Sequence, residues 1–154
     1  MSEPNKARSL PLALVLFFCF LLLVCVALVA SPPAKTAANT SPDYQNIDSN
    51  EKRIALLRSF GWEVEESPRE IVEVTIPREF DSVYETYNEL QAPLGLDLYP
   101  FRGRTVRRYT YVVKNHTSRS TVLANLLFSA DTFLGGDVCS AVPDGFVESL
   151  KKGV

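Results

Sequence analysis

The sequence predicts an α+β fold in which a small antiparallel sheet of about four strands packs with two main helices, preceded by one transmembrane helix. Three observations lead to this prediction. An uncharged apolar segment lies near the N-terminus, helical and alternating apolar patterns follow it, and the later strands are separated by short turns. Strands that short turns connect run antiparallel, which favours a meander over a parallel sheet.

Composition limits the classes of function. The chain has 154 residues, with 16 Lys+Arg against 18 Asp+Glu and a formal net charge of −2. This length leaves room for one small domain after the apolar segment, which excludes a large multi-domain enzyme. The charge balance argues against a polybasic protein, and we expect no nucleic acid among the partners.

Residues 10–30 form the apolar segment and contain no charged residue. As a helix they would reach roughly 31 Å, which matches the hydrocarbon core of a bilayer. Lys6 and Arg8 precede the segment, so the positive-inside rule predicts a cytoplasmic N-terminus and an exported C-terminal domain. A cleaved signal peptide is the alternative, but its apolar region would be unusually long. We therefore expect an uncleaved signal anchor in the cell membrane.

A polar stretch rich in Ser, Pro, Ala, Asn and Thr follows the apolar segment. Such a composition buries too little surface to offset the entropy of ordering, which is typical of a flexible tether. We therefore divide the chain into a cytoplasmic tail (1–9), a transmembrane signal anchor (10–30), a flexible linker (31–50) and an extracytoplasmic α+β domain (51–154).

The first half of this domain alternates helix, strand and helix. Asn50 is a candidate N-cap for a helix that Gly61 ends as a left-handed residue. Residues 71–77 alternate apolar and polar side chains, which predicts a strand. Apolar residues at helical spacing predict a second helix from residue 78 or 79 to 91.

The second half contains the remaining strands. Residues 105–114 alternate, residues 121–129 are apolar on both faces as in a central strand, and residues 133–139 form the last predicted strand. We expect a short helix over residues 144–150 to close the chain. The glycine pair at 135–136 predicts a turn or a bulge.

Several short runs resemble a known family: Phe60-Gly61-Trp62-Glu63-Val64, Val74-Thr75-Ile76-Pro77, Tyr87-Asn88-Glu89-Leu90-Gln91, Arg108-Tyr109-Thr110-Tyr111, Ala124-Asn125-Leu126-Leu127, Gly135-Gly136-Asp137-Val138-Cys139-Ser140 and Asp144-Gly145-Phe146. In this order they are similar to uncharacterised exported domains of unknown function from clostridia-like Gram-positive bacteria. The resemblance implies one N-terminal membrane segment and one small domain, and it carries no reaction, cofactor or catalytic residue.

The candidates for catalysis are weak. Cys139 is the one cysteine outside the apolar segment, and His116 is the one histidine of the chain. A thiol nucleophile would need His116 as its base, but neither residue lies in a motif with a known mechanism. A small buried residue is the usual state of a free cysteine, and an intermolecular disulfide is a further alternative. If Asn125 is buried in its apolar strand, we expect it to bond to the backbone.

Neither a metal nor another cofactor is expected. One histidine and one exported cysteine lack the spacing of a zinc site, and no loop resembles a calcium site. Clustered bases suggest a possible surface for an anionic partner: Arg102, Arg104, Arg107, Arg108, Lys114 and Arg119. Pairing of these bases with the acidic half of the same domain is the interpretation that we favour.

Together these observations favour a membrane-tethered extracytoplasmic domain that is not an enzyme. It would contact the lipid bilayer through residues 10–30 and bind an unknown envelope protein, polymer or small ligand. An envelope thiol-dependent enzyme that uses Cys139 is one alternative. An accessory subunit of a membrane complex is another.

Overall fold

Five strands lie side by side in sequence order in the structure, a computed structural model that describes residues 43–153. Every pairing between neighbouring strands is antiparallel. The strands are β1 (Glu70–Thr75), β2 (Thr105–Val113), β3 (Val122–Ser129), β4 (Thr132–Ser140) and β5 (Val147–Ser149). The α+β class and the antiparallel sheet are confirmed, although the sheet has five strands where we expected about four.

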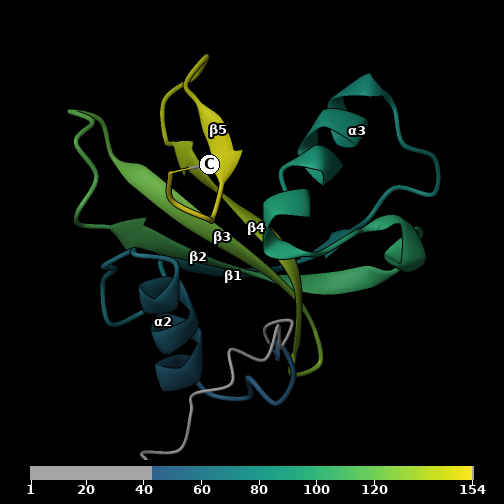
Figure 1. Cartoon of the computed structure of the whole chain (residues 1–154), viewed down its shortest axis with the longest axis horizontal. Helices are drawn as coiled ribbons and strands as arrows, with labels where there is room; N and C mark the ends of the chain where they lie inside the picture. Colours follow the sequence, from purple (N-terminus) through teal and green to yellow (C-terminus); the bar gives the residue numbers. More distant parts are fainter. Residues whose placement is uncertain (1–42, 154) are drawn as a thin grey trace, which may run out of the picture. The chain divides into compact units, whose positions relative to one another are not determined.

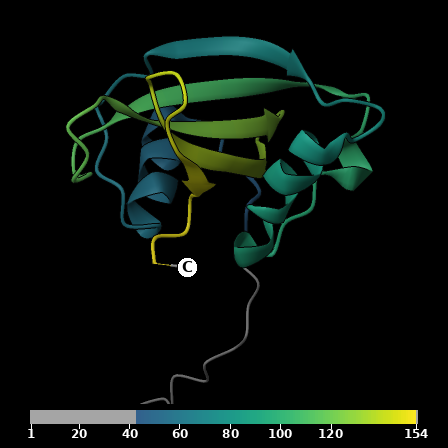
Figure 2. The ribbon, with the colours of Figure 1, turned by 90° about the horizontal axis from the view of Figure 1, so that it is seen from above.

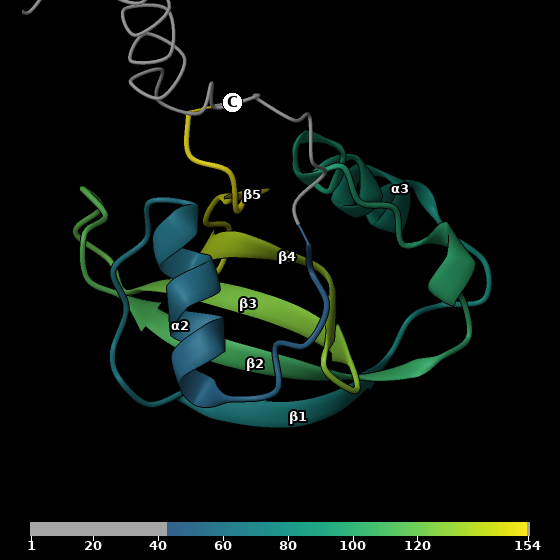
Figure 3. The same ribbon diagram turned by 60° about the horizontal axis from the view of Figure 1, so that its bottom comes forward.

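Two α-helices lie on opposite faces of this sheet. Helix α2 (Asn50–Ser59) precedes β1, and helix α3 (Ser82–Glu89) follows it. Figure 1 shows the two helices on either side of the sheet, and Figure 3 shows α2 in front of the strands with α3 behind them. Two short 3₁₀ turns, η1 (Ala92–Leu94) and η2 (Tyr99–Phe101), lead from α3 to β2.

The helix ends follow from their capping residues. The N-cap of α2 is Ser49, one residue before the predicted cap, and its hydroxyl accepts from the backbone N of Lys52 at 3.3 Å. Gly61 follows the helix at φ +93°, the left-handed conformation that the sequence predicts. Helix α3 starts later than predicted because Asp81 caps it, its carboxylate accepting from the backbone N of Tyr84 at 2.8 Å.

The domain begins earlier than predicted, so the expected linker 31–50 is wrong over its last residues. Tyr44 and Ile47 are buried in the core. The Tyr44 hydroxyl donates to the carbonyl oxygen of Leu94 at 2.9 Å, and the backbone N of Phe133 donates to the Tyr44 carbonyl at 2.9 Å. Two apolar side chains thus fix a segment whose average composition is typical of a tether.

The predicted terminal helix over 144–150 is also wrong, because β5 occupies this segment. Val147 pairs with Cys139, which adds a short strand to the open edge of β4. Leu150 then turns into the core, and its carbonyl oxygen accepts from Nε1 of Trp62 at 2.6 Å. Pairing with β4 and burial of one leucine override the weak helical pattern of the segment.

The cytoplasmic tail 1–9, the anchor 10–30 and the linker up to residue 42 were predicted in a part of the chain that lies outside the described residues. Between residues 43 and 153, no helix has both the length and the apolar character needed to cross a membrane.

Candidate functional site

The two faces of the sheet are covered unequally. On the α2 face, one large cluster of buried apolar side chains joins the helix to the three central strands. On the other face, a smaller apolar cluster lies under α3: Ile76, Leu98, Val106, Leu127 and Leu134. Figure 2 shows α3 over one end of the strands, while α2, at the other end, packs against the opposite face, so that among residues 43–153 no helix covers that end of this face. The candidate site lies on this face, where α3 borders the open end of the strands.

Polar side chains emerge on this face at alternate positions of three neighbouring strands. They are Arg108 and Thr110 on β2, Asn125 on β3, and Asp137 and Cys139 on β4. Because strand residues two apart point to the same face, one register brings all of them together. Thr110 pairs with Asn125, and Asn125 pairs with Asp137. We call these five side chains the polar strip.

Hydrogen bonds connect most of the polar strip into one network that includes α3. The Thr110 hydroxyl donates to Oδ1 of Asn125 at 2.8 Å, and Nδ2 of Asn125 donates to Oδ2 of Asp137 at 2.9 Å. The Tyr87 hydroxyl donates to Oδ1 of Asp137 at 2.9 Å. Nδ2 of Asn125 also lies 3.4 Å from Sγ of Cys139. The expected backbone partner of Asn125 is therefore wrong, since side chains satisfy it.

Burial changes the acid–base properties of this network. Burial raises the pKa of the Asp137 carboxyl, and the hydrogen bonds from Asn125 and Tyr87 partly oppose this effect. Burial, followed by the nearby Asp137 charge, raises the pKa of Tyr87 well above its ordinary value. The Tyr87 hydroxyl therefore stays protonated at neutral pH and serves as a permanent donor to the carboxylate.

Arg108 is the one cation of the polar strip. Its Nη2 donates to Oε2 of Glu70 on β1 at 2.6 Å. The side chain is 36% exposed, but its Nε is shielded from solvent and has no acceptor among the described residues. A buried donor without an acceptor costs about 1–3 kcal/mol, so this guanidinium has binding capacity that the protein does not use.

A groove runs between this guanidinium and α3. Its volume is about 360 Å³, and its floor contains Arg108, Asn125 and Asp137. Its walls are largely apolar and come from β1, β3 and α3: Val74, Thr75, Val83, Tyr84, Tyr87 and Leu127. A second hollow of about 480 Å³ lies on the other side of Tyr87 and Val83. A larger hollow of about 550 Å³ lies beside the end of α2 and has no part of the polar strip in its lining.

A glutamine holds α3 in place over the strip. Gln91 is fully buried, and its Oε1 accepts from the backbone N of Gly136 at 2.8 Å while its Nε2 donates to the carbonyl oxygen of Tyr87 at 3.0 Å. Gly136 has no room for a side chain, because a Cβ there would overlap the carbonyl oxygen of Asn125. The expected bulge lies next to this glycine pair, because the pairing of β3 with β4 shifts its register between Leu127 and Phe128, and Leu127 pairs with Gly135.

The structure does not bring the predicted catalytic pair together. Cys139 belongs to the polar strip, and burial, followed by the Asp137 charge, raises the pKa of its thiol to about 11. His116 instead stacks between Trp62 and Phe146, with ring centroids at 5.9 Å and 5.0 Å, beside the core of the α2 face. The thiol is thus protonated at neutral pH, and His116 does not lie beside it.

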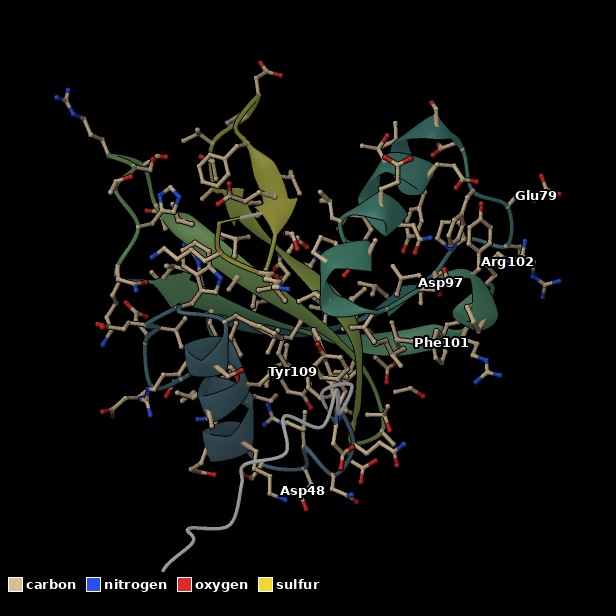
Figure 4. All side chains as sticks on the ribbon, viewed as in Figure 1. Asp48, Glu79, Asp97, Phe101, Arg102 and Tyr109 are labelled. Atoms are coloured by element: carbon tan, nitrogen blue, oxygen red, sulfur yellow. The ribbon has the colours of Figure 1, made fainter. Side chains whose placement is uncertain are left out.

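The six bases predicted to form one anionic-partner surface are dispersed. Arg107 and Arg108 are adjacent in β2 and therefore point to opposite faces. Arg102 lies over the Tyr99 ring with its Cζ 5.1 Å from the centroid, in the segment next to α3 (Figure 4). The other three also lie at separate places: Arg104 over the Phe101 ring, and Lys114 and Arg119 beyond the far end of β2. Only Arg108 lines the groove, and its bond to Glu70 agrees with the internal pairing that we favoured.

No cluster of three or more His, Cys, Asp or Glu side chains suited to a metal ion occurs within residues 43–153. Sequence reasoning did not find the site, although it noted Asn125, Cys139 and Arg108 one at a time. The signal that could have found it is the alternation of polar residues at 108 and 110, and at 137 and 139. Which positions become neighbours depends on the strand register, which the sequence does not state.

Comparison with known proteins relates the chain to a family. Residues 56–138 match the sequence model of a protein family that is described as a domain of unknown function, DUF4830. The matched range includes Glu70, Tyr87 and the whole polar strip except Cys139. Among curated proteins and among solved structures, none matches the chain significantly.

Proposed function

Since the chain belongs to the DUF4830 family of domains of unknown function, we propose a role from its geometry: a membrane-tethered extracytoplasmic module that binds a ligand in the groove beside α3. One observation carries the proposal. The groove combines apolar walls with a guanidinium whose Nε lacks an acceptor in the part of the chain that the structure describes, while the neighbouring polar side chains are bonded to one another. Small-molecule sites typically pair apolar walls with a few placed polar groups in this way.

The proposed role is binding without catalysis. The strongest nucleophile of the groove region would be Cys139, and a thiol pKa of about 11 leaves only about one molecule in ten thousand ionised at pH 7. Asp137 would have to act as a base, but both of its oxygens accept hydrogen bonds from protein groups. These features support a binding site more than a reaction centre.

The proposed location rests on the N-terminal sequence. Residues 10–30 are long and apolar enough for a membrane-spanning helix, and Lys6 and Arg8 precede them. A membrane-impermeant maleimide tests this placement on intact cells with Lys151→Cys in a Cys139→Ser chain, whose two other cysteines, Cys19 and Cys25, lie in the apolar segment 10–30. Residue 151 is exposed in the structure. Labelling of intact cells is expected, whereas labelling only after lysis would place the domain in the cytoplasm.

The groove itself is tested by filling it. Val83 is 74% exposed and lines the groove, so Val83→Trp adds bulk there without disturbing the core. The matched control is Val142→Trp, at another exposed valine that is 51% exposed and does not line the groove. A small-molecule library is screened by NMR against the full chain in detergent micelles. Ligands are expected that bind the wild type and the control but not Val83→Trp, and a screen without such ligands would refute the proposal.

A further inference from the structure

We propose that the ligand of the groove is a carboxylate on a small apolar body, and that Arg108 receives this carboxylate in exchange for Glu70. This inference rests on the proposed binding function and names its ligand class. The carboxylate could belong to a free branched-chain acid or to the C-terminus of a peptide, because both present the same two oxygens. The contacts of the groove lead to this class by elimination.

Among the buried side-chain nitrogen and oxygen atoms of the described residues, Nε of Arg108 is the one without a hydrogen-bond partner, and it is a donor. The Thr110 hydroxyl and the Tyr87 hydroxyl already donate within the network, and Nδ2 of Asn125 is shared between Asp137 and Cys139. The guanidinium has five N–H donors, and one hydrogen bond to a side chain is formed, through Nη2. A ligand therefore has to supply oxygen acceptors to match what the groove offers.

The shape of the guanidinium favours a carboxylate among oxygen acceptors. Nε and Nη2 of an arginine form a fork that fits two carboxylate oxygens, and such paired bonds are stronger and more specific than single ones. Among residues 43–153, Glu70 engages Nη2 alone, and Nε of Arg108 has no acceptor. Arg108 and Glu70 are both partly exposed, so a small movement of either side chain admits a ligand carboxylate to the fork.

The walls define what the carboxylate is attached to. Val74, Val83 and Leu127 face the groove, together with two tyrosine rings of α3. A volume of about 360 Å³ lies at the small end of ligand sites, which run from about 300 to 1,000 Å³. A short branched aliphatic group fits this volume and leaves the carboxylate at the floor beside Arg108. A ligand with two carboxylates is disfavoured there, because Asp137 already lies in the floor and Arg108 is the one cation that lines the groove among the described residues.

The test uses two acids and their uncharged amides. The probes are 4-methylpentanoate, 4-methylpentanamide, and acetyl-Ala-Leu with a free or an amidated C-terminus. Binding to the full chain in detergent micelles is followed by calorimetry and by the NMR signals of the arginine side chains. At least one acid is expected to bind and to shift the Nε signal of Arg108, and its amide is expected to bind about tenfold or more weakly. The better of the two acids then identifies the source of the carboxylate.

The two faces of β1 and β2 supply matched control variants. Arg108→Gln is expected to weaken the acid about tenfold or more, while Arg107→Gln, which removes the same charge on the opposite face, leaves its affinity unchanged. Glu70→Gln removes the competitor and is expected to strengthen binding about two- to fivefold, the range that a partly exposed ion pair supports. Glu73→Gln, on the opposite face of β1, is expected to have no effect.

The outcomes separate this inference from the proposed function. Equal binding of acids and amides, or equal losses in Arg107→Gln and Arg108→Gln, would overturn the carboxylate and leave the groove as a binding site. Weaker binding in Glu70→Gln would overturn the exchange with Glu70. If no probe shifts a groove signal, the carboxylate assignment fails, and the Val83→Trp screen decides independently whether the groove binds a ligand of another class.

Discussion

Removal of one hydroxyl measures how strongly the polar strip depends on α3. Tyr87→Phe deletes the donor that lies 2.9 Å from Oδ1 of Asp137 and leaves the ring in place. A hydrogen bond to a charged acceptor contributes about 1.5–3 kcal/mol, and one to a neutral acceptor contributes about 0.5–1.5 kcal/mol. The free energy of unfolding should therefore fall by the larger amount where Asp137 is ionised and by the smaller amount where it is protonated.

The sign of the pH dependence follows from linkage. Burial raises the pKa of Asp137 in the folded state above its value in the unfolded chain, so the folded state holds this proton more tightly. Stability from this group is consequently present at low pH and is lost as the pH rises through the raised pKa. The Tyr87 hydroxyl lowers the pKa of Asp137, so Tyr87→Phe raises this pKa further and makes the total loss of stability with rising pH larger.

The assay is urea unfolding of the full chain in micelles at about pH 4 and about pH 8, followed by the fluorescence of Trp62. The chain has one tryptophan, and it is 2% exposed, so its emission reports unfolding of the core. Tyr84→Phe is the matched control, from the same helix and the same wall, and it should change stability by less than about 0.5 kcal/mol. Equal costs of Tyr87→Phe at both pH values, or an equal cost for Tyr84→Phe, would refute the reasoning.

Four further predictions concern the fold and the polar strip. Gly136→Ala should destabilise the domain by more than about 3 kcal/mol in urea unfolding, because the new Cβ overlaps the backbone of β3. Gly95→Ala, where φ is +73° but the space is open, should cost only about 1 kcal/mol. Cys139 should react slowly with a soluble maleimide at pH 7 and faster as the pH approaches 11, and fast labelling at pH 7 would contradict its raised pKa. Tyr44→Ala should lower the free energy of unfolding by about 2–4 kcal/mol in thermal unfolding. A change under about 0.5 kcal/mol would show that the segment around Tyr44 belongs to the flexible linker and not to the domain.

Most of the sheet could be predicted from the sequence because its strands alternate or are apolar on both faces. Residues 105–114 and 121–129 carry these patterns, and β2 and β3 match both ranges to within a residue or two. The pattern is informative here because each strand buries a defined face. The short segment 144–150 offers too few positions to separate a helix from a strand, and only its pairing with β4 decides it.

The start of the domain and the polar strip could not be predicted for a different reason. Tyr44 is one aromatic residue in a polar stretch, and its burial depends on contacts with residues far along the chain, Leu94 and Phe133. Likewise, Arg108 on β2 and Asp137 on β4 are separated in the sequence by all of β3 and its two connecting turns. They come together only through the register of the three strands. Local patterns identify strands, but they do not state which residues of different strands become neighbours.

The contrast between neighbouring charges shows why position, and not composition, defines the candidate site. Glu73 and Arg107 pair directly across β1 and β2 on one face, while Glu70 and Arg108 form an ion pair on the other. The two pairs are chemically alike, and in the sequence they are indistinguishable. Glu73 and Arg107 line a smaller hollow of about 200 Å³. Only the second pair lies beside an apolar groove and a buried carboxyl, and only there does a buried guanidinium nitrogen lack an acceptor among the described residues. A difference in ligand binding between variants of these two pairs would therefore report on the groove itself, since loss of charge is common to both.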